Sequence, residues 1–343
     1  MLPAGIQKLV QMARSQKASD IHICVGAPIL FRVGKDLVPS TAGKVTPELA
    51  ERMATQLLND DQMAQFRQGL DYDLMAGDES GRYRVNVSFN DRSIGLVIRI
   101  LPEEAHSLEQ LHLPEVIRGF AGLTKGLVLI TGSTSQGKSA TMSAIINEIN
   151  CTLRRHVVTI EDPIETVHIN KMSLVRQREI GRDTKTFYSG LRAALRQDPD
   201  VLAIGEMRDY ETIKIALTAA ETGILVLSTL HIISIDKMIE RLLSYSPADD
   251  QEHLRYLLAG ALQAVIHQEL LPGTSGKRVA CEVLVATDAV KNVIRRRDGY
   301  LLRNLIHTGS RYGMISMGQS VEELLSQGLI ERQIAENVLT NYA

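Results

Sequence analysis

Residues 130–140 read ITGSTSQGKSA, in which Gly132 is followed by four residues and then by Gly137, Lys138 and Ser139. The stretch follows an apolar run and precedes residues with helical spacing. A glycine-rich turn between a strand and a helix suits phosphate, because the backbone N–H groups of the turn and the positive end of the helix both face the anion. The stretch therefore predicts a phosphate-binding loop in an α/β domain.

The individual residues of this loop would have different roles. Lys138 would reach the β- and γ-phosphates of a nucleotide, and Ser139 would bind Mg²⁺. A chance glycine-rich turn is the alternative, which we disfavour because the expected strand and helix flank the loop. The predicted nucleotide-binding residues are Gly132, Ser133, Thr134, Ser135, Gln136, Gly137, Lys138, Ser139 and Ala140.

Short apolar runs alternate with stretches of helical pattern in the second part of the chain. Such runs are typical of parallel strands whose sheet is covered by helices on both faces, and they predict an α/β core. Beyond residue 236 the pattern is mostly helical, with one β-like interruption at residues 278–285. The apolar runs are residues 127–130, 157–160, 201–204 and 225–227.

The start of the chain has a different pattern. Apolar and polar residues alternate at residues 82–89, and more loosely at 94–100, as they do in strands with one buried face. This predicts a small α+β domain with an antiparallel sheet. A stretch with prolines and no clear period follows. We therefore place a first domain at residues 1–102, a linker at 103–122, and an α/β domain with a C-terminal helical region at 123–343.

Charge and composition narrow the class of protein. The 38 basic and 40 acidic side chains nearly balance, and aromatic residues make up 4% of the chain, so nothing favours a nucleic-acid partner. Cys24, Cys151 and Cys281 are widely spaced and cannot form a zinc site, and they indicate a reducing compartment. No stretch approaches the roughly 18 apolar residues of a membrane span. We expect a soluble, cytoplasmic protein.

Carboxylates follow two of the apolar runs, in IEDPIE at residues 160–165 and in IGEMRD at residues 204–209. The carboxyl ends of parallel strands open on the same crevice as a phosphate loop, where acids can bind a metal ion and orient water. Taken alone, Glu161 and Asp209 are equally compatible with a solvated loop charge or a helix cap. Together with the loop, the acids predict a nucleotide-hydrolysing site.

The chain contains, in this order, the motifs ASDIHI, RYRVN, GSTSQGKS, TIEDPIETVH, LRAALRQDPDVLAIGEMRD, TAAETGILVLSTLH and AVKNVIRR. In sequence and order these motifs resemble the type IV pilus retraction ATPases, the PilT-like branch of the secretion ATPase superfamily. The resemblance covers almost the whole chain. It implies a PAS-like first domain, a RecA-like P-loop ATPase domain, bound ATP and Mg²⁺, and a homo-hexameric ring.

The resemblance also implies roles for single side chains. Glu165 would activate the attacking water, and Glu206 would assist both the metal ion and the water. His231 would sense the state of the nucleotide, although by itself it could equally be a core histidine. The arginines of the first domain that match the family's active-site arginines would otherwise be read as a solvated strand face. They are Arg82, Arg84 and Arg99.

The sequence departs from the family pattern at four positions. Ser133 and Ser135 stand where the family usually has proline and glycine, and Ala140 replaces a usual threonine. Ile224 replaces the first histidine of the family's histidine box, so that His231 alone is kept. A glycine lost from a phosphate loop hinders a positive φ or a close backbone approach. These departures predict nucleotide binding with slow hydrolysis.

The predicted function is that of a cytoplasmic, hexameric motor that hydrolyses ATP to retract a pilus in twitching motility. It would act on a pilus platform protein, and so associate peripherally with the inner membrane, without nucleic acid. Extension and secretion motors of the resembling superfamily commonly carry a four-cysteine metal insert, which three scattered cysteines cannot form.

Four alternatives stay open. A transport ATPase of a type IV secretion system is the nearest, and an ATP-binding assembly subunit with weak turnover is another. A small-molecule kinase is disfavoured because no arginine-rich lid follows the core. A nucleic-acid motor is disfavoured by the charge balance and the scarce aromatic residues.

Overall fold

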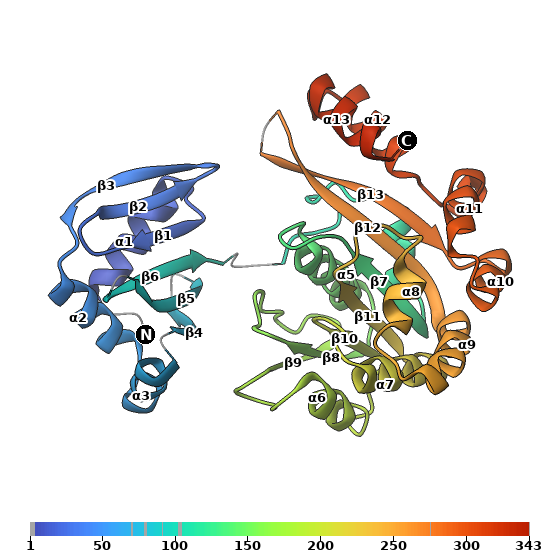
Figure 1. Cartoon of the computed structure of the whole chain (residues 1–343), viewed down its shortest axis with the longest axis horizontal. Coiled ribbons are helices and arrows are strands. Elements are labelled where there is room, and N and C mark those ends of the chain that lie inside the picture. Colours follow the sequence, from blue (N-terminus) through green and yellow to red (C-terminus); the bar gives the residue numbers. More distant parts are fainter. Residues whose placement is uncertain are drawn as a thin grey trace. The chain divides into compact units, whose positions relative to one another are not determined.

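The computed structural model describes residues 4–69, 71–78, 81–90, 92–101, 105–274 and 276–342. Two compact units make up the chain, residues 1–104 and residues 105–343 (Figure 1).

The first unit is a six-stranded sheet with three helices. Its strands pair antiparallel in the order β3-β2-β1-β6-β5-β4. Helices α1, α2 and α3 pack on β1, β6 and β4, and the side chains between sheet and helices form a core that includes Phe31, Tyr83 and Ile98. The elements are α1 (Ala4–Ser15), β1 (Asp20–Ile23), β2 (Pro28–Val33), β3 (Asp36–Lys44), α2 (Pro47–Leu57), α3 (Asp60–Gly69), β4 (Asp71–Asp78), β5 (Gly81–Asn90) and β6 (Ser93–Ile100).

The second unit is built on a seven-stranded sheet of order β13-β12-β7-β11-β10-β8-β9. All neighbours pair parallel except β13, which pairs antiparallel with β12. The strands are β7 (Gly126–Thr131), β8 (His156–Glu161), β9 (Leu174–Glu179), β10 (Val201–Ile204), β11 (Leu225–Leu230), β12 (Leu262–Pro272) and β13 (Lys277–Val285).

Helices and short 3₁₀ turns connect and follow these strands. The helices are α4 (Val116–Ala121), α5 (Lys138–Thr152), α6 (Phe187–Ala194), α7 (Tyr210–Glu221), α8 (Met238–Leu243), α9 (Gln251–Ala261), α10 (Asp288–Arg296), α11 (Leu302–Thr308), α12 (Met317–Ser326) and α13 (Arg332–Tyr342). The 3₁₀ turns are η1 (Ala248–Asp250), η2 (Gly299–Leu301) and η3 (Ser310–Tyr312).

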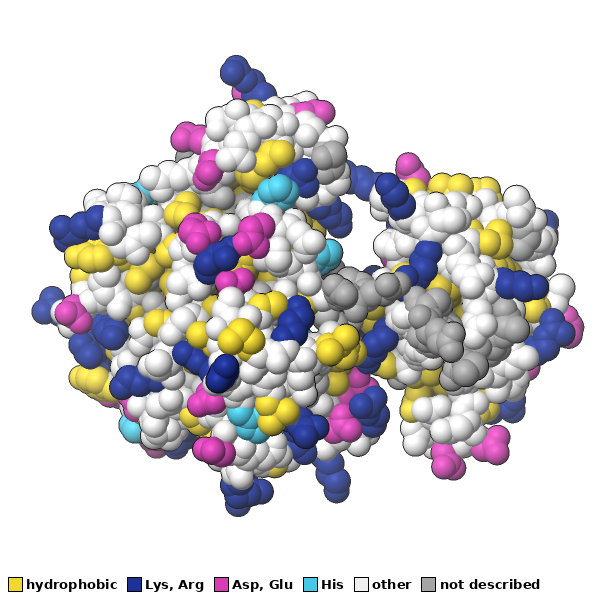
Figure 2. Space-filling view, turned by 180° about the vertical axis from the view of Figure 1, so that it is seen from behind, with side chains coloured by type: hydrophobic (Ala, Val, Ile, Leu, Met, Phe, Trp, Pro, Cys, Tyr) yellow, Lys and Arg dark blue, Asp and Glu magenta, His cyan; other side chains and the backbone are white. Residues whose placement is uncertain are grey.

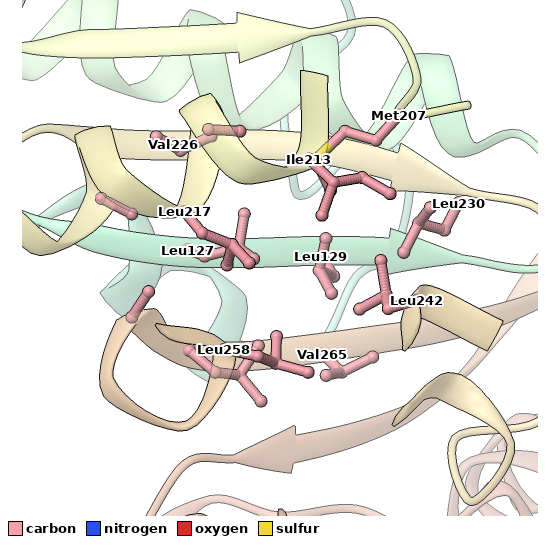
Figure 3. Packing of buried hydrophobic residues seen from close by; sticks show 14 of the residues in the cluster. Leu127, Leu129, Met207, Ile213, Leu217, Val226, Leu230, Leu242, Leu258 and Val265 are labelled. Carbon is pink, nitrogen blue, oxygen red and sulfur yellow. The ribbon is translucent and has the colours of Figure 1, made fainter. Parts of the chain in front are cut away.

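The four apolar runs are the parallel strands β7, β8, β10 and β11, and their position in the sheet explains their composition. On β7, Leu127 and Leu129 belong to one core layer, whereas Val128 and Ile130 belong to the other. A strand with both faces buried has no reason to alternate between apolar and polar residues. Figure 3 shows the first layer, where strand residues meet helix residues. Its labelled members are Leu127, Leu129, Met207, Ile213, Leu217, Val226, Leu230, Leu242, Leu258 and Val265.

Strand β12 is an element that the sequence pattern did not indicate. We expected helical structure there, but Leu262–Pro272 is an eleven-residue strand beside β7. Its apolar residues do not alternate, because most of the strand is buried between β7 and β13. A buried strand and a buried helix have similar composition, so periodicity alone does not separate them.

The predicted linker, residues 103–122, is described from residue 105 onward. From there it belongs to the second unit, where α4 packs on α5. Leu108, Ile117 and Phe120 are buried in the same core layer as Val128. No helix among the described residues has the length and apolarity to cross a membrane.

Helices α12 and α13 pack on the ribbon of β12 and β13. On β13, Glu282 is 7% exposed and lies opposite His267 of β12. Burial raises the pKa of Glu282 to about 7, although Arg303 and a hydrogen bond from the backbone N–H of Met317 oppose the shift. The carboxyl group is therefore protonated more readily in the folded protein than in the unfolded chain.

This raised pKa predicts a pH-dependent gain of stability from Glu282→Gln. The proton on Glu282 stabilises the fold fully below the unfolded pKa of 4.5, and this contribution is lost as the pH rises toward the folded pKa of about 7. The variant should therefore gain up to about 3 kcal/mol relative to wild type between pH 5 and pH 8. Urea unfolding of both proteins at several pH values measures the difference. A constant difference across this range would contradict the raised pKa.

Candidate functional site

The phosphate loop lies between the carboxyl end of β7 and the first turn of α5, as predicted. Gly137 is the N-cap of α5 with φ +82°, a backbone conformation that glycine adopts without strain. In the register of the sheet, Thr131 at the end of β7 pairs with Leu230 at the end of β11, and Ile204 at the end of β10 pairs with Ser228. The segments that follow β10 and β11 therefore begin at the same edge of the sheet as the loop.

Strand β12 supports the loop through backbone contact. Gly132 has φ +144°, and a Cβ on it would lie 2.5 Å from the carbonyl oxygen of Gln268, so this position requires glycine. The Gln268 side chain donates a hydrogen bond to the carbonyl of Gln136 (2.6 Å), and the backbone N–H of Leu270 donates to the Gln136 side chain. The start and the end of the loop are thus both held by β12.

Lys138 is buried inside the loop, with 7% of its surface exposed. Its Nζ donates to the carbonyl oxygens of Gly132 (2.9 Å) and Ser133 (2.7 Å). Burial lowers the pKa of Lys138, and the nearby Glu206 carboxylate opposes this shift. The ammonium group is thus held where its acceptors are loop carbonyls, which phosphate oxygens can replace. Ser139 is exposed on the first turn of α5.

His231 joins the loop to the acid that follows β10. Its Nδ1 lies 3.3 Å from Lys138 Nζ and 3.5 Å from Thr134 Oγ1, and its Nε2 lies 3.4 Å from Glu206 Oε2. Because the lysine donates to Nδ1, the ring proton belongs on Nε2, facing Glu206. Burial, and then the charge of Lys138, lower the pKa of His231, so the ring is neutral at pH 7. His231 therefore lies in a polar chain between Lys138 and Glu206.

Glu206 has a second partner that the sequence did not indicate. The guanidinium of Arg208 lies 2.5 Å from Glu206 Oε1, and its side chain is 67% exposed. Both residues belong to the GEMRD motif, but spacing alone does not show whether an arginine two residues after an acid turns back toward it. The structure thus brings Lys138, Glu206, His231 and Arg208 together at one edge of the sheet.

The other predicted acids have different surroundings. Glu161 ends β8 and accepts hydrogen bonds from Thr159 (2.6 Å) and Gln177 (3.0 Å). Asp209 is the N-cap of α7 and accepts from the backbone N–H of Thr212 (2.8 Å), so the helix-cap interpretation holds for it. Glu165 is half-buried between β8 and β9, and the described residues show no hydrogen bond or ion pair between it and the group above. Its role as water activator stays a prediction.

The three arginines of the first unit share one face of its sheet. Arg84 on β5 pairs in register with Arg99 on β6, and Arg82 lies two residues before Arg84, so all three point away from the buried Tyr83. Arg84 forms an ion pair with Asp73 (3.2 Å) and Arg99 with Asp20 (2.8 Å). Their contact with a phosphate stays a prediction.

Backbone strain at Ser135 predicts the effect of restoring glycine. Ser135 has φ +64°, a left-handed conformation that destabilises a residue with a Cβ by roughly 1 kcal/mol. We expect Ser135→Gly to raise the rate of nucleotide hydrolysis, because the loop then reaches this conformation without strain. Ser135→Ala is the matched control, since it removes the hydroxyl and keeps the Cβ. Equal rates for wild type and the glycine variant, or equal gains in both variants, would exclude strain as the cause.

The comparisons with known proteins agree with the geometry. The family model described as Type II/IV secretion system protein matches residues 1–308. The chain is 39% identical over 332 residues to the type IV pilus retractation ATPase PilT of Pseudomonas aeruginosa, covering 96% of each protein. It is 41% identical over 315 residues to a twitching motility protein of Neisseria gonorrhoeae, covering 91% of this chain and 84% of that protein.

Solved structures show the same similarity. A crystal structure of the pilus retraction motor PilT with bound ADP superposes with a TM-score of 0.87 at 36% identity, covering 96% of this chain and 95% of that one. The ATPase DotB of Legionella pneumophila superposes with a TM-score of 0.85 at 27% identity, covering 99% and 96%. These relatives confirm the predicted resemblance, fold class and enzyme class, an ATPase. The chain therefore belongs to the Type II/IV secretion system protein family.

Proposed function

We propose that this chain is the motor that hydrolyses ATP to drive retraction of a type IV pilus in twitching motility. The observation that carries the proposal is the polar chain Lys138, His231 and Glu206 at the phosphate loop, in a protein that matches a pilus retraction ATPase over 96% of both chains. Such a loop with an adjacent acid is suited to positioning a phosphate and stabilising its developing charge.

The site residues fit ATP with Mg²⁺. The hydroxyl of Ser139 at the first turn of α5 and the carboxylate of Glu206 are oxygen ligands of the kind that Mg²⁺ prefers, directly or through water. Bound Mg²⁺ would neutralise part of the charge on the β- and γ-phosphates. The loop residues 132–140 would hold the phosphates through their backbone N–H groups.

Each side chain of the site has its own role in hydrolysis. Lys138 exchanges its bonds to the loop carbonyls for bonds to phosphate oxygens. His231 then loses or changes its contact with Lys138 while its Nε2–H still faces Glu206, which is how the ring would sense the nucleotide. Glu165 accepts a proton from the attacking water, and Arg82, Arg84 and Arg99 stabilise charge on the γ-phosphate.

The proposed assembly is a homo-hexameric, cytoplasmic ring that acts on a pilus platform protein and so associates peripherally with the inner membrane. Nucleic acid has no part in it. On the face of the second unit shown in Figure 2, the basic side chains of the described residues lie among acidic and apolar ones, whereas a phosphate backbone would favour a continuous basic groove.

A second candidate function is transport by a type IV secretion system. The family model, described as Type II/IV secretion system protein, favours it. A weakly hydrolysing assembly subunit is the third, because Ser135 and Ile224 depart from the family pattern. Hydrolysis rates and cell phenotype separate the three.

Substitution of the acids tests the chemistry. We expect Glu165→Gln to bind nucleotide normally and to hydrolyse it about 10²–10⁴-fold more slowly, as when a general base is lost. Lys138→Gln should lose binding. Glu161→Gln is the matched control, because its carboxylate is bonded to Thr159 and Gln177. Phosphate release and nucleotide affinity measure these effects. Loss of hydrolysis in Glu161→Gln alone would move the role of base to Glu161.

The same variants test the biological role. Cells that lack the protein should carry more surface pili and lose twitching motility, and wild type but not Glu165→Gln should restore both. Unchanged pili together with a loss of substrate export would favour the secretion ATPase. A wild-type hydrolysis rate no higher than that of Glu165→Gln, with nucleotide still bound, would favour the assembly subunit.

We further propose that the active site is completed between subunits, with the arginines supplied by the first unit of a neighbour. Glu165→Gln keeps the arginines, whereas Arg84→Ala combined with Arg99→Ala keeps the acid, so mixed rings contain some interfaces with both. Hydrolysis should therefore reappear when the two inactive proteins exchange subunits, since an arginine finger contributes about 10³-fold or more.

The control is a covalently linked dimer with one intact interface. If mixed rings form and stay inactive while the linked dimer hydrolyses ATP, every site in a ring must be intact. If the linked dimer is also inactive, the arginines act within their own chain.

A further inference from the structure

A row of buried and half-buried polar side chains lies under the phosphate loop and has no part in the mechanism above. His267 of β12 is 1% exposed. Its Nδ1 lies 3.0 Å from Thr131 Oγ1, and its Nε2 lies 3.0 Å from the hydroxyl of Tyr342. That hydroxyl in turn donates to Glu269 Oε1 (2.7 Å). The row connects α13, through β12, to the last residue of β7.

The donor and acceptor of each hydrogen bond in this row follow from the groups at its ends, Glu269 and Thr131. The Tyr342 hydroxyl gives its proton to Glu269 and therefore accepts from His267 Nε2–H. His267 Nδ1 then has no proton and accepts from the Thr131 hydroxyl. This requires a neutral ring, and burial lowers the pKa of His267 to about 4. Burial and the contact with Glu269 raise the pKa of Tyr342, so its hydroxyl stays protonated. All donors and acceptors of the row are matched.

The row ends at the loop itself. Thr131 immediately precedes Gly132, and it is the parallel neighbour of His267 in the sheet. The residues after His267 hold the rest of the loop, since Gln268 and Leu270 both bond Gln136. A shift of β12 would therefore act on the loop at both of its ends.

The other end of the row depends on the C-terminal helices. Helices α12 and α13 pack on the β12–β13 ribbon through an apolar cluster, and the Ser320 hydroxyl of α12 accepts from the backbone N–H of Cys281 (2.9 Å) (Figure 1). Tyr342 is carried by α13, so the packing of this helix pair decides where its hydroxyl lies. The apolar cluster consists of Leu271, Ala280, Met317, Val321, Leu324, Ile330, Ala335 and Val338.

We propose that Tyr342 and His267 are positioning residues that hold the phosphate loop through Thr131, so that the packing of α12 and α13 sets the affinity for nucleotide. The proposal rests on the proposed function for the identity of the ligand, but the effect on the loop does not. A partner that moves the helix pair would thereby change the nucleotide site without touching it. The alternative is a purely structural role, in which the row stabilises the C-terminal helices and does not affect the phosphate loop.

Two substitutions remove one hydroxyl each and keep the shape of the side chain, Tyr342→Phe and Thr131→Val. Thr131→Ser keeps the hydroxyl and serves as the rescue, and Tyr300→Phe removes the hydroxyl of a tyrosine that is 71% exposed. Hydrogen–deuterium exchange of the peptide 131–140 in the protein without nucleotide reports on the loop. Titration with a fluorescent ADP analogue reports on affinity.

We expect exchange in residues 131–140 to be roughly fivefold to tenfold faster in Tyr342→Phe and in Thr131→Val, as when one buried hydrogen bond is lost. The dissociation constant for the ADP analogue should rise by a similar factor. Thr131→Ser and Tyr300→Phe should stay near wild type. The double variant should be no worse than about the more severe single variant, because both break the same row.

Faster exchange confined to residues 317–342, or additive effects in the double variant, would overturn the proposal. If Tyr342→Phe fails to fold, the comparison of Thr131→Val with Thr131→Ser decides alone, since neither touches α13. If wild type binds no nucleotide, the proposed function fails, whereas the exchange of residues 131–140 still decides whether the row holds the loop.

Discussion

The close approach of Gly132 to the carbonyl of Gln268 is the contact on which the rest of the site depends. A Cβ at position 132 would lie 2.5 Å from that oxygen, so the loop can lie against β12 only because the residue is glycine. The approach requires β12 beside β7 in the observed register, with His267 opposite Thr131. The long-range pairing of two buried strands thus determines the shape of a local loop.

The electrostatics of the site follow from how little water reaches Lys138. A buried ammonium group needs acceptors, and before nucleotide binds these are two loop carbonyls and the ring of His231. Partial burial and the charge of Lys138 lower the pKa of His231 and keep the ring neutral, which leaves its Nε2–H for Glu206. Glu206 also pairs with Arg208. A ligand that draws Lys138 away from His231 would therefore change the charges and hydrogen bonds around Glu206. In the proposed function, His231 would therefore couple nucleotide binding at Lys138 to the surroundings of Glu206.

Local features of this fold and site could be predicted from the sequence, whereas features that depend on long-range pairing could not. The loop at residues 132–139 and strand β7 could be predicted because their signals, the glycine spacing and the apolar run, each lie within a few consecutive residues. Strand β12 was missed, since its partner β7 is more than 130 residues earlier in the chain. The contact of Arg208 with Glu206 depends on the path of the backbone after β10. Residues 105–122 pack into the core of the second unit, and their local sequence pattern does not indicate this packing.

The loop is held from two sides by contacts of different character. On the side of β10 and β11, the side chain of His231 is 43% exposed and lies 3.4 Å from Glu206. On the side of β12, Thr131 and His267 are almost fully buried, and their donors and acceptors fit only one arrangement. Breaking that arrangement leaves buried polar groups unpaired, which is more unfavourable than breaking an exposed ion pair. The side of β10 and β11 is thus suited to responding to the nucleotide. The side of β12 is suited to holding the loop in one fixed geometry.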